Sequence, residues 1–223
     1  SNKGGIYWTR ADGAGKPQLL VSGTHQQWPW SFTGDGRRLS FQENRGDTGW
    51  DILTVPIEST GSGLRAGKPE ALLSTQSYER QPSFSPDGRW IAYSSNESGA
   101  DQVYVKSFPD NGGKWPVSGP GGLQPVWSWD RHELFFRNAD NQIMVASFTF
   151  SGDSFTPGKP WLWSETRLAN ASLNGMYDLV GDGKRIVALM PVVESGQRKA
   201  QNQVVFLMNF FDELRRRVRD GSK

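Results

Sequence analysis

A motif that recurs four times along the chain constrains the fold more strongly than any other feature of the sequence. Each copy places an Asp in a short turn and an aliphatic residue four positions after it. The copies lie at residues 32–36, 84–88, 127–131 and 179–183, so that successive Asp residues are about 52, 43 and 52 positions apart. Repeats of this length are typical of solenoids and propellers. Because one such unit cannot bury its own apolar face, we expect neighbouring copies to stack and form the core.

The second copy indicates how one repeat is built. Its β-branched and aromatic segments are separated by clusters of Gly, Pro, Asn and Asp, as is typical of short strands joined by turns. We predict four strands in it, over residues 81–84, 90–94, 103–108 and 115–118. By the same pattern, third strands are expected over 51–57, 142–148 and 203–210, fourth strands at 72–73 and 161–163, and a third and a fourth strand in the N-terminal region over 6–10 and 19–21.

Four-stranded units at this interval predict an all-β fold, a β-propeller with about four to five blades in this chain. The expected organisation is a propeller over residues 1–213, with a partial blade 1–24 and repeats at about 25–75, 76–120, 121–168 and 169–213, followed by a basic tail over 214–223. The two chain ends supply about five strands where a shared closing blade needs about four. We therefore expect a fragment of a larger propeller, or a small ring that closes irregularly or associates with a second copy through unpaired blade edges.

Composition narrows the classes of function. The chain has no Cys, which excludes disulfides, thiol nucleophiles and thiolate metal sites. Its net charge of +2 is carried by residues 211–223 and the remainder is neutral, so no nucleic-acid-binding surface is predicted. No apolar run reaches the length of about 20 residues that a membrane span requires.

The sequence lacks the motifs of the common catalytic classes. It has no kinase Gly-rich loop, no His-Arg-Asp or Asp-Phe-Gly triplet and no Gly-x-Ser-x-Gly elbow of hydrolases. His25 and His132 lie in different repeats, so neither a metal site nor a cofactor is predicted. Glu79 and Asp178 are acids near the predicted first strands, but their unequal positions make a poor glycosidase pair. We therefore predict that the chain is not an enzyme, with a carbohydrate-active enzyme as the weaker alternative.

One resemblance to a known family is specific. Residues 80–99, with Val103–Val105 and Gly112–Trp115, resemble the TolB-type propeller repeat, which is also called WD40-like or PD40. They are especially similar to the form that lies C-terminal to many bacterial (acidobacteria-type) serine/threonine protein kinases, and residues 204–214 resemble the end of those propellers. The first and third copies depart from the Ser-Pro-Asp-Gly core, because Gly34 replaces Pro in one, and Trp129 and Arg131 replace Pro and Gly in the other.

The resemblance covers nearly the whole chain and implies a binding module. It suggests the sensory or interaction domain of a bacterial signalling kinase, in the periplasm or elsewhere outside the cytoplasm, with a cytoplasmic location as the alternative. The second interpretation is a freestanding TolB-like envelope scaffold that docks partner proteins.

A binding site is expected where loops enter the first strands, because these loops ring one mouth of a propeller channel. The predicted channel-mouth residues are His25, Gln27, Trp28, Glu79, Arg80, Gln124 and Tyr177. Aromatic rings beside amides and charges suit a protein, a small polar ligand or a glycan. The alternative for Glu79 and Arg80 is that they only pair with each other.

The ten Trp residues divide into two predicted roles. Trp28 and Trp50 are expected in or beside loops, where they are available to a partner. Packing between blades is expected for Trp30, Trp90, Trp127, Trp161 and Trp163. The Asp and Asn residues of segments 44–51 and 96–101 are interpreted as local turns and not as calcium ligands.

Overall fold

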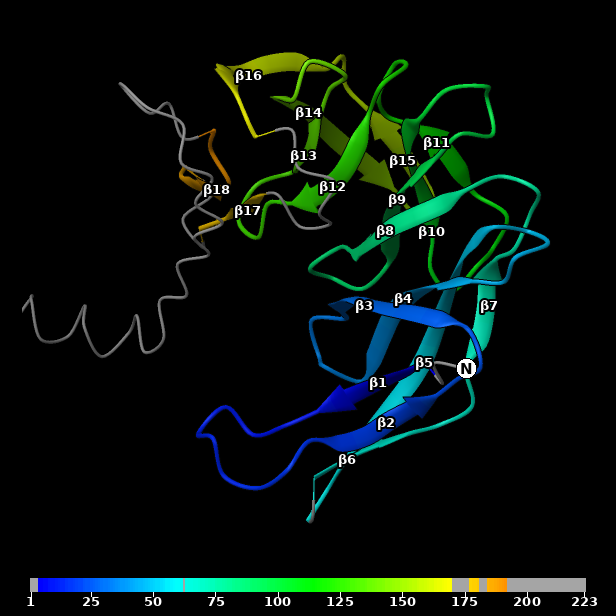
Figure 1. Cartoon of the computed structure of the whole chain (residues 1–223). Helices are drawn as coiled ribbons and strands as arrows, with labels where there is room; N and C mark the ends of the chain where they lie inside the picture. Colours follow the sequence, from blue (N-terminus) through cyan, green and yellow to red (C-terminus); the bar gives the residue numbers. More distant parts are fainter. Residues whose placement is uncertain (1–3, 62, 170–176, 181–183, 192–223) are drawn as a thin grey trace, which may run out of the picture. The chain divides into compact units, whose positions relative to one another are not determined.

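The computed structural model describes residues 4–61, 63–169, 177–180 and 184–191. All of these belong to the first of two units, Ser1–Pro191 and Val192–Lys223. The regular elements of the described residues are all β-strands, which confirms the predicted all-β class (Figure 1). The predicted strand over 203–210, positions 181–183 of the fourth motif copy and the tail over 214–223 lie outside the described residues.

The strands form antiparallel sheets that follow one another along the chain. A hairpin of β1 (Gly5–Trp8) and β2 (Gln18–Ser22) comes first. Blade 1 contains β3 (Gln26–Phe32), β4 (Arg38–Asn44), β5 (Trp50–Thr60), β6 (Gly63–Ala66) and β7 (Glu70–Leu73); blade 2 contains β8 (Glu79–Phe84), β9 (Trp90–Ser95), β10 (Gln102–Ser107) and β11 (Lys114–Pro116); blade 3 contains β12 (Leu123–Trp127), β13 (Glu133–Arg137), β14 (Gln142–Ser151), β15 (Ser154–Pro157) and β16 (Trp161–Arg167). A second hairpin of β17 (Tyr177–Leu179) and β18 (Ile186–Ala188) completes the described elements.

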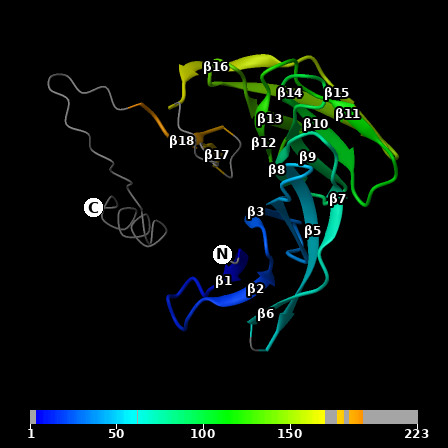
Figure 2. The ribbon, with the colours of Figure 1, turned by 45° about the vertical axis from the view of Figure 1, so that its right-hand side comes forward.

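The first strand of each blade lies at the same edge of its sheet. The strands pair in the order first, second, third and fourth, so β3, β8 and β12 are edge strands. Strand β8 contacts both β3 and β12, and Figure 2 shows these first strands in succession, opposite β7, β11 and β16. The arrangement places corresponding residues of three blades beside one another.

The recurring Asp closes the turn between the first and second strands through its side chain. Asp35 Oδ1 accepts hydrogen bonds from the Thr33 hydroxyl at 2.6 Å and from the Arg37 amide at 3.0 Å. Asp87 accepts the equivalent bonds in blade 2, from Ser85 at 2.6 Å and from the Arg89 amide at 3.1 Å. The glycines that follow have φ of 69° and 70°, in the left-handed region that favours glycine. The motif therefore has a structural explanation.

Apolar side chains fill the spaces between successive sheets. Between blades 2 and 3, Trp90 packs with Val105, Trp127, Phe148 and other buried side chains. Another cluster joins the β1–β2 hairpin to blade 1, and a third joins blade 3 to Tyr177 of β17. Each blade therefore buries its faces against its neighbours, as the repeat predicted.

The Trp predictions are correct only in part. Trp90 and Trp127 are buried between blades, as expected. Trp161 and Trp163 are 43% and 39% exposed, because β16 is the outer edge strand of blade 3 in the described residues. Trp28 lies within β3, and Trp50 begins β5, so the prediction that both lie in or beside loops was wrong for the first.

Two third strands extend beyond their own sheets and fold back as short hairpins. In blade 3, β14 continues into β15, and Phe155 of β15 packs against Trp90 and Trp115 of blade 2 at ring distances of 5.4 and 5.9 Å. In blade 1, β5 continues into β6, which lies beside β2 of the preceding hairpin. Each extension therefore contacts the sheet before its own.

Candidate ligand-binding site

The first strands of the three blades line a cavity of about 710 Å³. Its wall includes Trp30 of β3, Pro82 of β8 and Pro125 of β12, and β17 contributes Tyr177. Its rim carries Trp129, which is 65% exposed. Concave, mostly apolar sites with a few polar groups are the usual form of ligand sites in proteins.

The cavity divides the predicted channel-mouth residues into two groups. Gln124 and Tyr177 are part of its lining, whereas the other five predicted residues do not contribute to it. Strands β3 and β8 begin near those residues and end at the Asp turns that border the cavity. The cavity therefore lies toward the turn end of the strands, and the remaining predicted residues lie at their starting end.

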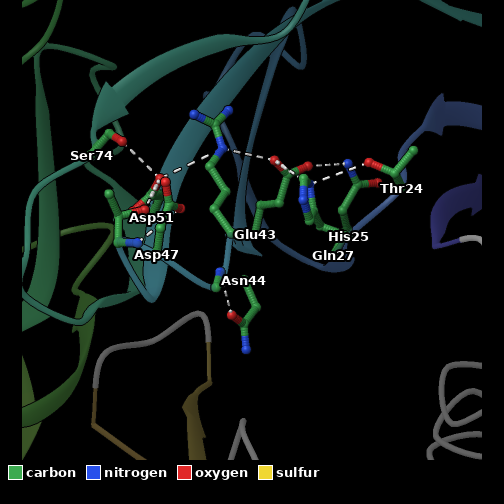
Figure 3. Close-up of polar contacts among 11 residues, drawn as sticks. Thr24, His25, Gln27, Glu43, Asn44, Asp47, Asp51 and Ser74 are labelled. Carbon is green, nitrogen blue, oxygen red and sulfur yellow. Dashed lines mark hydrogen bonds and ion pairs between the residues drawn. The ribbon is translucent and has the colours of Figure 1, made fainter.

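At the starting end of blade 1, a buried carboxylate contacts three side chains (Figure 3). Two of them were predicted as channel-mouth residues and the third was not. Glu43 of β4 accepts hydrogen bonds from Gln27 Nε2 at 2.6 Å and from Arg45 Nε at 2.9 Å. His25 Nδ1 lies 3.7 Å from Glu43 Oε1. The Nε2 atom of Gln27 is therefore occupied by Glu43, and its Oε1 is buried without a partner in the described residues. The half-exposed His25 ring is the most accessible part of this group.

Asp51 extends the same network to blade 1's fourth strand and its loops. Its carboxylate is fully buried and accepts from the Ser74 hydroxyl at 2.8 Å and from the Thr48 hydroxyl at 3.0 Å, with Arg45 Nε at 3.5 Å. Glu43, Arg45 and Asp51 were not predicted from the sequence to act together. The sequence feature that could have indicated this group is Glu43, an acidic residue within the segment that forms the mostly buried strand β4.

Trp28 is held by an aromatic contact within blade 1. Its ring lies edge-on to that of Trp50, with centroids 5.9 Å apart, and both side chains are partly buried. Edge-to-face pairs of this kind stabilise packing by about 0.5–1.5 kcal/mol. Trp28 therefore combines a packing role with partial exposure at the starting end of β3.

Glu79 and Arg80 do not pair with each other, so that alternative was wrong. Successive residues of a strand point to opposite faces, which separates the two side chains. Arg80 Nη2 donates to Asp101 Oδ1 at 2.5 Å, and the Thr75 hydroxyl donates to Glu79. Glu79 is 1% exposed, and burial raises its pKa above the usual 4.5, a shift that the Thr75 hydroxyl opposes and Asp51 reinforces.

Glu79→Gln is expected to stabilise the fold at neutral pH. The raised pKa means that folded Glu79 keeps its proton at pH values where the unfolded chain has lost it. Stability contributed by the neutral carboxyl is therefore complete below about 4.5 and is lost as the pH rises through the folded pKa. The advantage of Glu79→Gln in urea midpoint should grow between about pH 4 and pH 7.

A control variant tests the assigned cause of that shift. Thr75→Val removes the hydroxyl that stabilises ionised Glu79, so it should steepen the loss of stability with rising pH. Parallel pH profiles for the wild-type protein and Glu79→Gln would contradict the burial of an ionisable carboxyl.

A line of buried amides connects the blades beside the cavity. Gln42 Oε1 accepts a hydrogen bond from the backbone N–H of Gln81 at 3.0 Å, and Gln81 Oε1 accepts one from the backbone N–H of Gln124 at 2.9 Å. The Tyr177 hydroxyl then donates to the Gln124 carbonyl at 2.8 Å. Gln81 and Gln124 occupy equivalent irregularities of β8 and β12, with φ of 58° and 57°. The backbone of Gln124 therefore has a structural role in addition to its place in the cavity wall.

The described part of the chain has neither a metal-ligand cluster nor a helix that could span a membrane. No group of three or more His, Asp or Glu side chains there is arranged to hold a metal ion. The same residues include no helix with the length and apolar character of a membrane span.

Comparisons with known proteins relate the chain to one fold. No family model matches it. An uncharacterized protein of Agrobacterium fabrum is 26% identical over 160 residues, which are 67% of this chain and 51% of that protein. The solved structure of a provisionally named TolB from Agrobacterium tumefaciens has a TM-score of 0.52 and 19% identity, over 71% of this chain and 57% of that chain.

TolB from Acinetobacter baumannii is similar at a TM-score of 0.53 and 17% identity, over 78% of this chain and 40% of that chain. The chain thus spans about half the length of the curated relative, 51%, and of the first structure, 57%. At these identities the likeness concerns the fold, and it confirms the predicted propeller, since these two structural neighbours are TolB β-propellers.

Proposed function

We propose that this chain is a non-catalytic propeller module that binds a segment of a partner protein in the cavity, with a small polar ligand or a glycan as the alternative occupant. The observation that carries the proposal is the exposed Trp129 at the cavity rim. It occupies the turn position that holds Gly34 in blade 1 and Pro86 in blade 2. Turn geometry does not call for a large ring there, whereas exposed aromatic residues are frequent anchors in binding sites.

The cellular role that we propose is that of a sensory or interaction domain outside the cytoplasm. The TolB fold supports a protein-binding scaffold, and the resemblance of residues 80–99 to kinase-linked propellers supports attachment to a bacterial signalling kinase. A freestanding TolB-like envelope scaffold is the alternative. Self-association is proposed for the edges of the β1–β2 and β17–β18 hairpins, which pair with no further strand among the described residues.

Binding is favoured over glycan hydrolysis by the positions of the two acids that sequence analysis singled out. Asp178 lines the cavity, but Glu79 is buried outside it with a Thr75 hydrogen bond. Two carboxyl groups of a glycosidase must flank one sugar linkage. The glycosidase alternative therefore has no pair among these residues.

Trp129→Ala is expected to weaken ligand binding by about tenfold or more, because buried aromatic anchors dominate binding energy in such sites. A random peptide library would be selected on the wild-type protein, and the affinity of the enriched peptides would be measured by calorimetry. Thermal stability should change little, since the indole is 65% exposed.

Trp161→Ala is the matched control, since it removes an indole that is 43% exposed on β16 and away from the cavity. It should leave peptide affinity within about twofold of wild type. Equal weakening by both variants, or a large loss of melting temperature in Trp129→Ala, would contradict the cavity as the binding site.

A further inference from the structure

Two arginines at the starting end of blades 2 and 3 are only partly paired. Arg80 of β8 and Arg137 of β13 each have a buried Nε atom without a hydrogen-bond partner in the described residues. One terminal nitrogen of each is used, by Asp101 for Arg80 and by Asn141 for Arg137. Since a guanidinium carries five N–H donors, both side chains retain donors for another acceptor.

The turn before β12 brings the two side chains into one region. The carbonyl of Asp101 accepts hydrogen bonds from the amides of Gly121 at 2.7 Å and Gly122 at 3.1 Å. The next residue, Leu123, is the register partner of Arg137. Asp101 therefore relates to both arginines: its carboxylate pairs with Arg80, and its charge also acts on Arg137.

Among the described residues, Asp101 is the one carboxylate that forms an ion pair with either arginine. Neighbouring acids are engaged elsewhere, because Asp140 pairs with Arg167 at 3.5 Å and Glu97 pairs with Lys114. No carboxylate of the described residues forms an ion pair with Arg137. Burial lowers the pKa of Arg137, and the nearby Tyr177 and Asp101 only oppose this effect. A half-buried cation without a full counter-charge is costly, and an anionic ligand would remove that cost.

We infer that Arg80 and Arg137 form a binding site for a carboxylate of the protein segment that enters the cavity. The planar guanidinium matches a carboxylate with two parallel hydrogen bonds, which an ammonium cannot reproduce. Leu123, the register partner of Arg137, directly precedes Gln124 of the cavity wall, so strand β12 runs from the arginine region to the cavity. The inference rests on the proposed function, since it assigns the chemistry of the same ligand.

Three defined tripeptides test this site by calorimetry at low salt on the whole chain. They are Glu-Glu-Glu with a free C-terminus, the same peptide with an amidated C-terminus, and Gln-Gln-Gln with a free C-terminus. Glu-Glu-Glu should bind, and Arg80→Gln and Arg137→Gln should each weaken it about tenfold or more. Arg65→Gln, which alters an exposed arginine on β6, should leave the affinity unchanged.

The other two tripeptides identify which carboxylate is bound. Loss of binding on amidation indicates the C-terminal carboxylate, and loss with Gln-Gln-Gln indicates a side-chain carboxylate. Arg80→Lys keeps the positive charge beside Asp101 but loses the planar guanidinium, so it should still weaken binding. This variant tests the site if Arg80→Gln does not fold.

Absence of binding to all carboxylate peptides, equal weakening by Arg65→Gln, or unchanged affinity in all the Arg80 and Arg137 variants would overturn the inference. The same variants distinguish failure of the carboxylate site from failure of the cavity as the binding site. If Trp129→Ala still weakens the library peptides while the arginine variants do not, the carboxylate site alone is wrong. If only the arginine variants have effects, the anion site stands and the cavity proposal is wrong.

Discussion

Trp90→Ala is expected to lower the free energy of unfolding by about 3–5 kcal/mol, the usual cost of truncating a buried Trp. Trp90 is 2% exposed and lies between blades 2 and 3, with ring contacts to Trp115 and Phe155 at 5.4 Å each. Its indole nitrogen has no hydrogen-bond partner in the described residues, so the contribution is packing. Removing the ring would leave a cavity between blades 2 and 3, because the two sheets cannot move together enough to fill it. Urea unfolding followed by far-ultraviolet circular dichroism measures the loss.

Two control variants separate packing from the general effect of losing a Trp. Trp90→Phe keeps much of the ring volume, so its cost should fall to about 1–2 kcal/mol. Trp161→Ala removes an exposed ring and should stay within about 0.5 kcal/mol of wild type. A loss below about 1 kcal/mol for Trp90→Ala would show that blades 2 and 3 do not share the core described for them.

Gln81→Ala is expected to cost about 1–3 kcal/mol, because the buried Ser94 hydroxyl would lose its acceptor while the Gln124 backbone N–H would keep only the Ser94 oxygen, at 3.0 Å. The Gln81 side-chain oxygen accepts from the Gln124 amide at 2.9 Å and from the Ser94 hydroxyl at 3.0 Å. Ala would inherit the same φ of 58°, so the comparison isolates the lost acceptor and not a change of backbone. Urea midpoints of the two proteins give the difference.

Variants of the neighbouring residues test whether the lost hydrogen bonds cause the loss of stability in Gln81→Ala. The Gln124 backbone N–H donates to both Gln81 Oε1 and the Ser94 hydroxyl oxygen, so Gln81→Ala and Ser94→Ala each leave it one acceptor. The double variant leaves it none and should therefore be more destabilising than the sum of the two single variants. Gln26→Ala, at an exposed position of β3, serves as the control for loss of an amide. If Gln81→Ala costs no more than Gln26→Ala, the buried amides do not couple the blades.

The strands of this fold could be predicted because their signals are local. Short segments with aromatic residues between turn-forming clusters located β8 at 81–84, where the strand runs Glu79–Phe84, and β16 at 161–163, where it runs Trp161–Arg167. The extensions of β5 and β14 were not predicted. Alternation continues smoothly past the edge of a sheet, so it does not indicate where a strand changes from pairing with its own blade to forming a separate hairpin.

The side-chain arrangement was harder to predict because its partners are distant in sequence. Arg80 pairs with Asp101 and not with the adjacent Glu79, and Gln81 bonds to residues of both neighbouring blades. A linear pattern identifies which residues enter the first strands but not which face they point to at an irregular register. The predicted exposure of aromatic residues failed for the same reason, since an outer edge strand has no sheet beyond it to cover Trp161.

The backward reach of β6 and β15 gives the array of blades a direction. Phe155 of blade 3 lies among the rings of blade 2, whereas β10 of blade 2 ends without such an extension toward blade 1. A copied unit placed after blade 3 would bring its own extension but would displace Tyr177 from the face of blade 3 that it now covers. A unit inserted between blades 2 and 3 would separate Phe155 from Trp90. Growth of such a propeller by duplication is therefore more readily accommodated at some junctions than at others.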